Sequence, residues 1–78
     1  MTLDGKYIGW DFAGKKLDGY VLSGDFTGAD FTGASLVGAD LRRGTFNDAK
    51  FARAKMKGAR LPATFALQVR RLQVRRGK

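Results

Sequence analysis

The chain has 78 residues, with 15 Lys and Arg against 7 acidic residues and a formal net charge of +8. A chain of this length holds one small domain. It contains no Cys and no His, which excludes disulfides, the common zinc sites and catalysis by a Cys or His side chain. We therefore expect neither an enzyme nor a bound metal or cofactor. The positive charge favours an anionic partner, either a protein or a nucleic acid.

The N-terminal residues, MTLDGKYIGW, contain no apolar run of signal-peptide length. The rest of the sequence also lacks the run of about 18 apolar residues that a membrane-spanning helix needs. We expect no membrane contact. A cytoplasmic location is the default expectation, because a chain without Cys gives no information about its redox compartment.

A five-residue period begins near Phe26. Large apolar residues recur at every fifth position, and a Gly or Ala stands two positions before each. The large residues are Phe26, Phe31, Leu36, Leu41, Phe46, Phe51, Met56 and Leu61. This period fits neither an α-helix nor a flat strand. Because a five-residue unit cannot bury its own apolar side chain, successive units must stack around a shared core.

The units GADFT, GASLV, GADLR and DAKFA resemble the pentapeptide-repeat family, whose consensus is close to A-[DN]-[LF]-x-x. The resemblance covers at least residues 24–63. It implies an all-β solenoid, a right-handed quadrilateral β-helix in which four units form one coil. In that fold the large residue and the Ala point inward and the other three positions point outward. We expect about three coils with a short C-terminal helix or cap.

The N-terminal third fits the same frame once one residue is taken as deleted. Leu22 lies four residues before Phe26, and steps of five then reach Leu17, Phe12 and Tyr7. Every fourth unit falls in one column, and like residues stack at the strand spacing. The columns are Tyr7, Phe26, Phe46; Phe12, Phe31, Phe51; Leu17, Leu36, Met56; and Leu22, Leu41, Leu61. We predict that residues 1–63 form the β-helix, with residues 1–23 as an irregular first coil and N-terminal cap.

The first coil lacks the Ala column. Trp10, Lys15 and Tyr20 occupy the positions that Ala fills one coil later. An unpaired Lys is too costly to bury, so these side chains must turn outward or fold over the open end. They form either a cap that shields the first core layer or a contact surface of two aromatic rings and a lysine. An uncovered solenoid end invites edge-to-edge pairing, which favours the cap.

After Leu61 the repeat stops at Pro62, and residues 64–78 form a basic segment. Thr64 can cap a helix that is apolar on both faces, and such a helix would cover the last coil and contact a second chain. Some gyrase-inhibiting members of the resembled family dimerise through C-terminal helices, so we expect a homodimer. The tandem LQVRR sequence of 67–76 leaves open a strand, an irregular cap, or a tail that a partner orders. The predicted cap and dimer contacts are Phe65, Leu67, Val69, Leu72 and Val74.

Charge is divided unevenly along the chain. Residues 1–40 contain six Asp and three Lys, whereas residues 41–78 contain one Asp and 12 Lys and Arg. An acid can pair with a base on the next rung, but the basic excess is too large to be matched internally. This excess of positive charge either binds an anionic partner or keeps the protein soluble. The predicted partner-binding residues are Arg42, Arg43, Arg53, Lys55, Lys57, Arg60, Arg70, Arg71, Arg75 and Arg76.

Two functions follow from these features. The first is a non-catalytic interaction module that presents a rigid surface, basic in its C-terminal half, to an anionic protein or nucleic acid. The resemblance implies the second, because several pentapeptide-repeat proteins mimic DNA. In this second function the protein is a small inhibitor of DNA gyrase, of another topoisomerase or of a CRISPR effector. Such an inhibitor can be of phage or of other origin. That inhibitor would use an acidic N-terminal coil, with a patch formed by Asp11, Asp25, Asp30 and Asp40.

Overall fold

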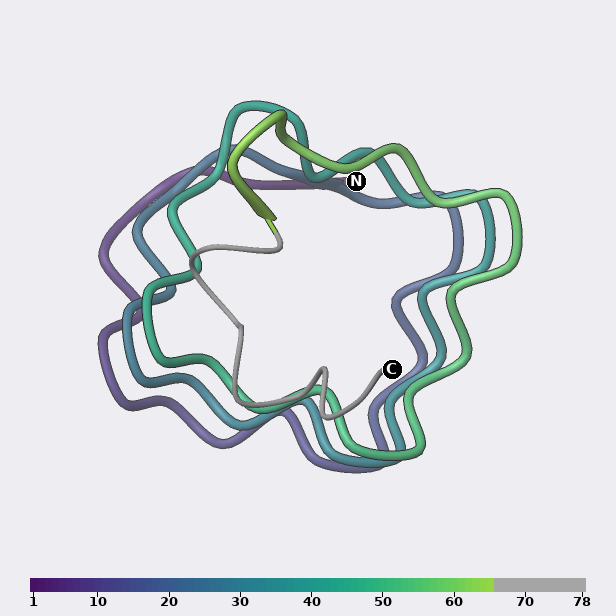
Figure 1. Cartoon of the computed structure of the whole chain (residues 1–78), viewed down its shortest axis with the longest axis horizontal. Coiled ribbons are helices and arrows are strands. Elements are labelled where there is room, and N and C mark those ends of the chain that lie inside the picture. Colours follow the sequence, from purple (N-terminus) through teal and green to yellow (C-terminus); the bar gives the residue numbers. More distant parts are fainter. Residues whose placement is uncertain (66–78) are drawn as a thin grey trace, which may run out of the picture.

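The computed structural model describes residues 1–65. The chain winds around a central core, and each pass lies over the preceding one (Figure 1). Two short strands, β1 (Thr2–Leu3) and β2 (Val21–Leu22), pair in parallel with Leu3 opposite Leu22. The rest of the described chain is joined by isolated parallel bridges. We call residues 3–21, 22–40 and 41–61 the first, second and third levels.

Four ladders of parallel bridges connect the levels, and each joins residues 19 or 20 positions apart. The bridged residue stands directly before a large apolar residue, so the register aligns the columns predicted from the sequence. We number the sides of the molecule by these ladders, from side 1 to side 4. The ladders are Lys6–Asp25–Thr45, Asp11–Asp30–Lys50, Lys16–Ser35–Lys55 and Val21–Asp40–Arg60.

Stacked aromatic rings fill one half of the core. Phe31 lies between Phe12 and Phe51, with ring centroids 5.0 and 4.9 Å away and ring planes within 7° of parallel. Phe26 lies between Tyr7 and Phe46 in the same manner, at 5.0 and 5.2 Å. The two aromatic columns predicted from the sequence are therefore confirmed, whereas Leu61 of the predicted fourth column is 43% exposed. Offset stacking at these distances is favourable beyond the burial of apolar area.

Each unit ends in a β-turn that explains why glycine recurs every five residues. The N–H of the small residue donates to the carbonyl of the preceding large residue, as from Ala34 to Phe31 at 2.9 Å. The third residue of the turn, which stands directly before the small residue, has a positive φ. Gly33 (φ 69) is an example. This conformation is characteristic of glycine. In the third level Asp48 (φ 59) and Arg53 (φ 56) adopt it instead.

The corner between sides 4 and 1 accommodates the deleted residue. Leu22 and Phe26 are separated by three residues there, whereas Leu41 and Phe46 are separated by four. The short corner is tight: a Cβ built on Gly24 would lie 2.2 Å from the Gly5 carbonyl oxygen. The fourth column begins at Leu3, four residues before Tyr7. The columns predicted from the sequence begin at Tyr7 and leave out Leu3, although Leu22 shows the same spacing before Phe26.

The first level is as regular in its bridges as the second, so the predicted irregularity of residues 1–23 is wrong for the backbone. Only the side chains at the Ala positions differ. The Trp10 ring lies 4.8 Å from Tyr7 and 6.0 Å from Phe12, and 54% of the residue is exposed. Tyr20 is half-buried against the core, and Lys15 is exposed.

At the opposite end Phe65 is buried, with its ring edge-on to Phe46 and Phe51 at 5.9 and 5.1 Å. Its N–H donates to the Pro62 carbonyl at 3.0 Å. Phe65 thus covers the last aromatic layer. Within residues 1–65 no helix is long and apolar enough to span a bilayer. The other predicted cap and dimer contacts lie outside the described residues: Leu67, Val69, Leu72 and Val74.

Candidate interaction surface

The levels differ sharply in charge. The first level has three Asp and three Lys, and the second has three Asp and neither Lys nor Arg. The third has seven Lys and Arg against Asp48 alone. The predicted acidic N-terminal coil is therefore wrong. Halving the sequence counted Asp25, Asp30 and Asp40 with the first coil, but the bridges place them in the second level.

The predicted acidic patch is spread over three sides of the molecule. Asp25 lies on side 1, Asp11 and Asp30 on side 2, and Asp40 on side 4. Each carboxylate accepts a hydrogen bond from the backbone N–H two residues later, such as Ala13 to Asp11 at 2.9 Å. These are Asx-turn contacts, which hold the backbone in its turn. This local role was not predicted, although an Asp three residues before a turn glycine is a recognisable signal.

Asp40 is also held by Arg42 of its own turn. The Arg42 guanidinium donates from Nε and Nη2 to the two carboxylate oxygens at 2.9 and 2.8 Å. These bonds hold the pKa of Asp40 well below its usual range and raise the pKa of Arg42. This is the one ion pair within residues 1–65. The acid and base expected to pair across rungs, such as Asp30 and Lys50, share a ladder but form no ion pair.

Asp18 connects the first and second levels. Its Oδ1 accepts a hydrogen bond from the Ser35 hydroxyl at 2.5 Å and another from the Val37 N–H at 3.0 Å. The Ser35 bond and then the Val37 bond lower the pKa of Asp18. Asp18 was not among the predicted site residues, because its partners lie 17 and 19 residues away along the chain and only the register brings them together.

We expect the protein to lose stability in acid. The pKa of each of the four hydrogen-bonded carboxyls lies below the ordinary value of 3.8. As the pH falls, the unfolded chain therefore binds protons at these carboxyls before the folded chain does. The stabilisation that the charged carboxylates give is complete above pH 3.8 and is lost as the pH falls through the lowered pKa values. The melting temperature measured from pH 6 to about pH 2 should fall. The four residues are Asp18, Asp25, Asp30 and Asp40.

The variant Asp18→Asn provides the control for this pH dependence. Its amide oxygen can still accept from Ser35 and Val37, but the side chain no longer titrates. We expect a smaller loss of melting temperature in acid than in the wild type. A melting temperature that stays constant or rises as the pH falls would contradict the role given to these carboxylates.

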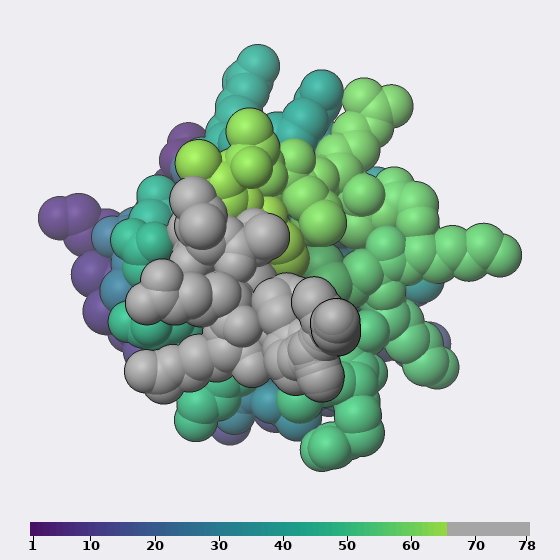
Figure 2. Space-filling view, viewed as in Figure 1, coloured from purple at the N-terminus to yellow at the C-terminus, as the bar shows by residue number. Residues whose placement is uncertain are grey.

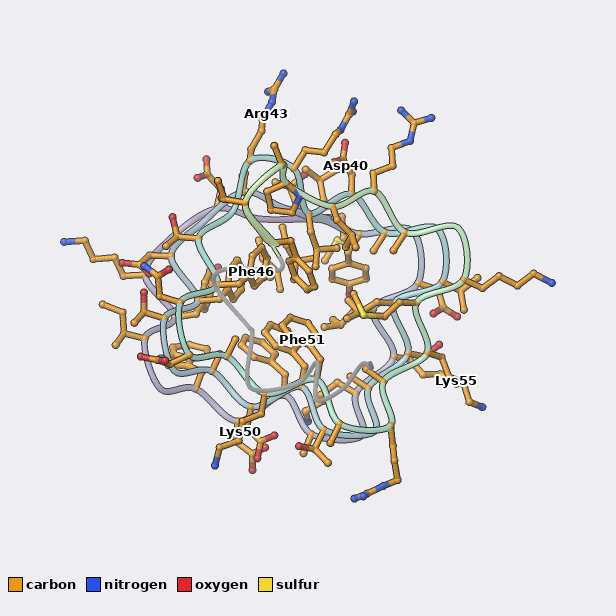
Figure 3. All side chains as sticks on the ribbon, viewed as in Figure 1. Asp40, Arg43, Phe46, Lys50, Phe51 and Lys55 are labelled. Atoms are coloured by element: carbon orange, nitrogen blue, oxygen red, sulfur yellow. The ribbon has the colours of Figure 1, made fainter. Side chains whose placement is uncertain are left out.

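We call seven cationic residues of the third level the basic rim. Figure 2 shows the long side chains of this level, in green, extending outward, and Figure 3 shows Arg43, Lys50 and Lys55 pointing away from the core in different directions. All seven are exposed. The rim occupies sides 2, 3 and 4, whereas the bridged residue on side 1 is Thr45. Its members are Arg42, Arg43, Lys50, Arg53, Lys55, Lys57 and Arg60.

Six of the predicted partner-binding residues belong to the basic rim, and the structure adds Lys50. The four others lie outside the described residues: Arg70, Arg71, Arg75 and Arg76. The Lys16–Ser35–Lys55 ladder is the one ladder among residues 1–65 without an acid, and Asp18 beside it is held by Ser35 and Val37.

Arg53 departs from the turn rule. Its φ of 56° places it in the left-handed region, where the corresponding turns of the first and second levels have Gly14 and Gly33. A residue with a Cβ is disfavoured there by about 1–2 kcal/mol. Residues held in such conformations are frequent at binding sites. In the described part of the chain, residues 1–65, no group of three or more acidic side chains is placed to hold a metal ion.

Parallel ladders between five-residue units define a repeat protein in which each level contacts only its neighbours. The model of the family described as pentapeptide repeats matches residues 25–61 in eight copies. This segment belongs to the pentapeptide-repeat family, as its sequence predicted, and the repeats imply a β-helix. No curated protein sequence matches the chain.

Proposed function

We propose that the protein is a non-catalytic interaction module that binds an anionic protein or nucleic acid through the basic rim, in the cytoplasm. The observation that supports this is the charge of the third level, where seven cations stand against one acid. Arg42 alone among them has an ion pair within residues 1–65. The match to pentapeptide repeats is consistent with a non-catalytic interaction module.

We infer that the scaffold is a right-handed quadrilateral β-helix of about three coils, closed by a basic segment at residues 64–78 that also forms a homodimer. The four ladders and the direction of winding in Figure 1 support the first inference. The buried ring of Phe65 supports the cap. On such a scaffold the cations of the rim are fixed at their backbones, so binding orders only their side chains.

The basic rim suits phosphates or carboxylates rather than base edges. Its cations surround the third level on three sides, and they are long exposed side chains without interleaved aromatic rings at the rim. Contacts of this kind position a partner and depend strongly on salt, but they carry little sequence information. The DNA-mimic alternative would need a continuous acidic surface, and no observation favours it over the rim.

Binding to duplex DNA, single-stranded RNA and poly-glutamate over a salt series tests the proposal. We expect the affinity for at least one polyanion to fall steeply with salt. Joint replacement of Lys50, Lys55 and Lys57 by Gln should lower the salt slope by about three for duplex DNA. The matched control replaces Lys6, Lys15 and Lys16 of the first level by Gln. No binding at low salt, or equal losses in the two triple variants, would overturn the proposal.

The variant Arg53→Gly separates stability from binding. Glycine relieves the left-handed strain, so we expect the free energy of unfolding to rise by about 0.5–1 kcal/mol. The polyanion affinity should fall, because a rim cation is lost. Urea unfolding and the binding assay measure the two effects. Arg53→Gln is the control: it loses the charge but keeps the Cβ, so it should weaken binding without stabilising the fold. Stabilisation by both variants, or by neither, would show that backbone strain is absent.

A further inference from the structure

The N-terminal end of the molecule has an unpaired backbone edge. In the second level, the residue before each large apolar residue directs both its N–H and its C=O toward the first level. The Asp25 N–H donates to the Gly5 carbonyl at 2.8 Å, and the Asp25 carbonyl accepts from the Tyr7 N–H at 2.7 Å. The corresponding first-level residues have no such partner among residues 1–65. They are Lys6, Asp11 and Lys16.

Side 4 differs, because β1 covers it. The Val21 N–H donates to the Met1 carbonyl at 2.9 Å, and β1 pairs with β2. Sides 1, 2 and 3 therefore each offer one residue whose N–H and C=O both face outward. Two residues that exchange both bonds form the hydrogen-bonded pair of an antiparallel ladder. An uncovered edge of this kind is a template for pairing with another chain.

A second copy related by a two-fold axis across this end presents its edge in the antiparallel direction. Charge restricts the axis to a corner of the molecule, because an axis through the middle of a side places a residue opposite its own copy. An axis through the corner at residues 8–10, between sides 1 and 2, places Lys6 opposite Asp11 of the second copy, and this contact occurs twice. An axis through the middle of side 2 would place Asp11 opposite Asp11. Opposite charges directly across an antiparallel pair are stabilising, and like charges are destabilising.

The same corner has exposed apolar side chains. Ile8 is 57% and Trp10 54% exposed. One level higher the equivalent positions hold Thr27, which is half-buried, and Ala29, which is fully buried. An axis at the next corner, between sides 2 and 3, would also place opposite charges across the pair, Asp11 and Lys16, but it would bring two copies of Lys15 together. The corner at residues 8–10 is thus the one place on this edge that combines apolar contact with charge complementarity.

The net charge of the two ends also favours this contact. The first level has equal numbers of Asp and Lys, so two copies of it carry no net charge that would repel them. We propose that two copies of the chain associate through their N-terminal ends, with Lys6 and Asp11 exchanging backbone hydrogen bonds and Trp10 and Ile8 buried at the axis. The contact does not involve the basic rim and does not depend on the function proposed for it.

Sedimentation equilibrium combined with fluorescence tests the contact, because Trp10 is the only Trp in the chain. With rising concentration we expect the mass to double or more and the Trp10 emission to shift to the blue. Lys6→Asp and Asp11→Lys, made separately, each place like charges opposite one another twice. Each variant should raise the dissociation constant of the association that shifts the Trp10 emission, by about tenfold or more.

An equimolar mixture of the two variants provides the decisive measurement. In a mixed pair both contacts are again between opposite charges, so the association and the blue shift should return. Lys16→Asp is the matched control: it reverses a charge on the same edge, but away from Asp11 of the second copy, and should leave the association unchanged. Circular dichroism verifies that the variants are folded. Because Asp11→Lys also removes a like-charge contact with Asp30, it should fold even if Lys6→Asp does not.

Three outcomes would overturn the proposal: wild-type Trp10 emission that is independent of concentration, a mixture of Lys6→Asp and Asp11→Lys that does not associate, or a loss in Lys16→Asp equal to that in Lys6→Asp. A contact through residues 64–78 alone would leave all the charge variants associated and the Trp10 emission constant, so it would also contradict the N-terminal contact. Loss of polyanion binding in the basic-rim variants would not change any of these results.

Discussion

Replacing Phe31 by Ala is expected to unfold most of the protein. The ring is fully buried and stacks on both Phe12 and Phe51, at 5.0 and 4.9 Å. Truncating a buried Phe to Ala costs about 3–5 kcal/mol, because apolar burial is lost and a cavity remains. A domain this small has a total stability of about the same size. One substitution in the middle of an aromatic column should therefore remove nearly all of it.

Urea unfolding followed by circular dichroism measures this loss. Val37→Ala is the control in the same level: its side chain points outward and is 40% exposed, so the change should lie within about 0.5 kcal/mol. A Phe31→Ala protein that stays folded with a loss below about 1 kcal/mol would show that the aromatic column is not the main source of stability.

Gly24→Ala is expected to be nearly as damaging, although it adds only a methyl group. The new Cβ would lie 2.2 Å from the Gly5 carbonyl oxygen and 2.6 Å from the Gly5 nitrogen. Both atoms belong to the backbone of the adjacent level, so no side chain can move aside. We expect a loss of about 3 kcal/mol or more, because the two levels must separate locally.

Gly5→Ala is the matched control, because Gly5 occupies the same corner one level below. Its nearest neighbour is the Tyr7 hydroxyl at 3.5 Å, an ordinary van der Waals distance. We expect a change below about 1 kcal/mol. Thermal melts of the two variants make the comparison, and equal losses would mean that the close approach of Gly24 to Gly5 is not a constraint.

The fold was predictable because it depends on a period. Phe12, Phe31 and Phe51 are neighbours in space since four units intervene at each step, and counting fives in the sequence finds them. The single deletion before Phe26 was visible for the same reason. The start of the fourth column at Leu3 was missed, although the four-residue step from Leu3 to Tyr7 repeats the step from Leu22 to Phe26.

The charge distribution was less predictable, because it depends on where each level begins. Asp40 lies in the first half of the sequence, yet it belongs to the same level as Asp25 and pairs with Arg42. The role of Asp18 required the register that places Ser35 above it. Residue type and spacing identified six of the seven exposed cations of the third level, all but Lys50. They did not show that most aspartates are hydrogen-bonded within their own turns.

The corner between sides 4 and 1 has a consequence for how this architecture tolerates changes in length. It has three intervening residues between Leu22 and Phe26 and four between Leu41 and Phe46, yet the ladders on all four sides remain aligned. One extra residue at this corner therefore leaves the same side chains facing inward on all four sides. The pair Arg42–Arg43 occupies the longer version of this corner, where Arg43 points away from the core (Figure 3). This corner is therefore the natural place to graft a loop onto the scaffold.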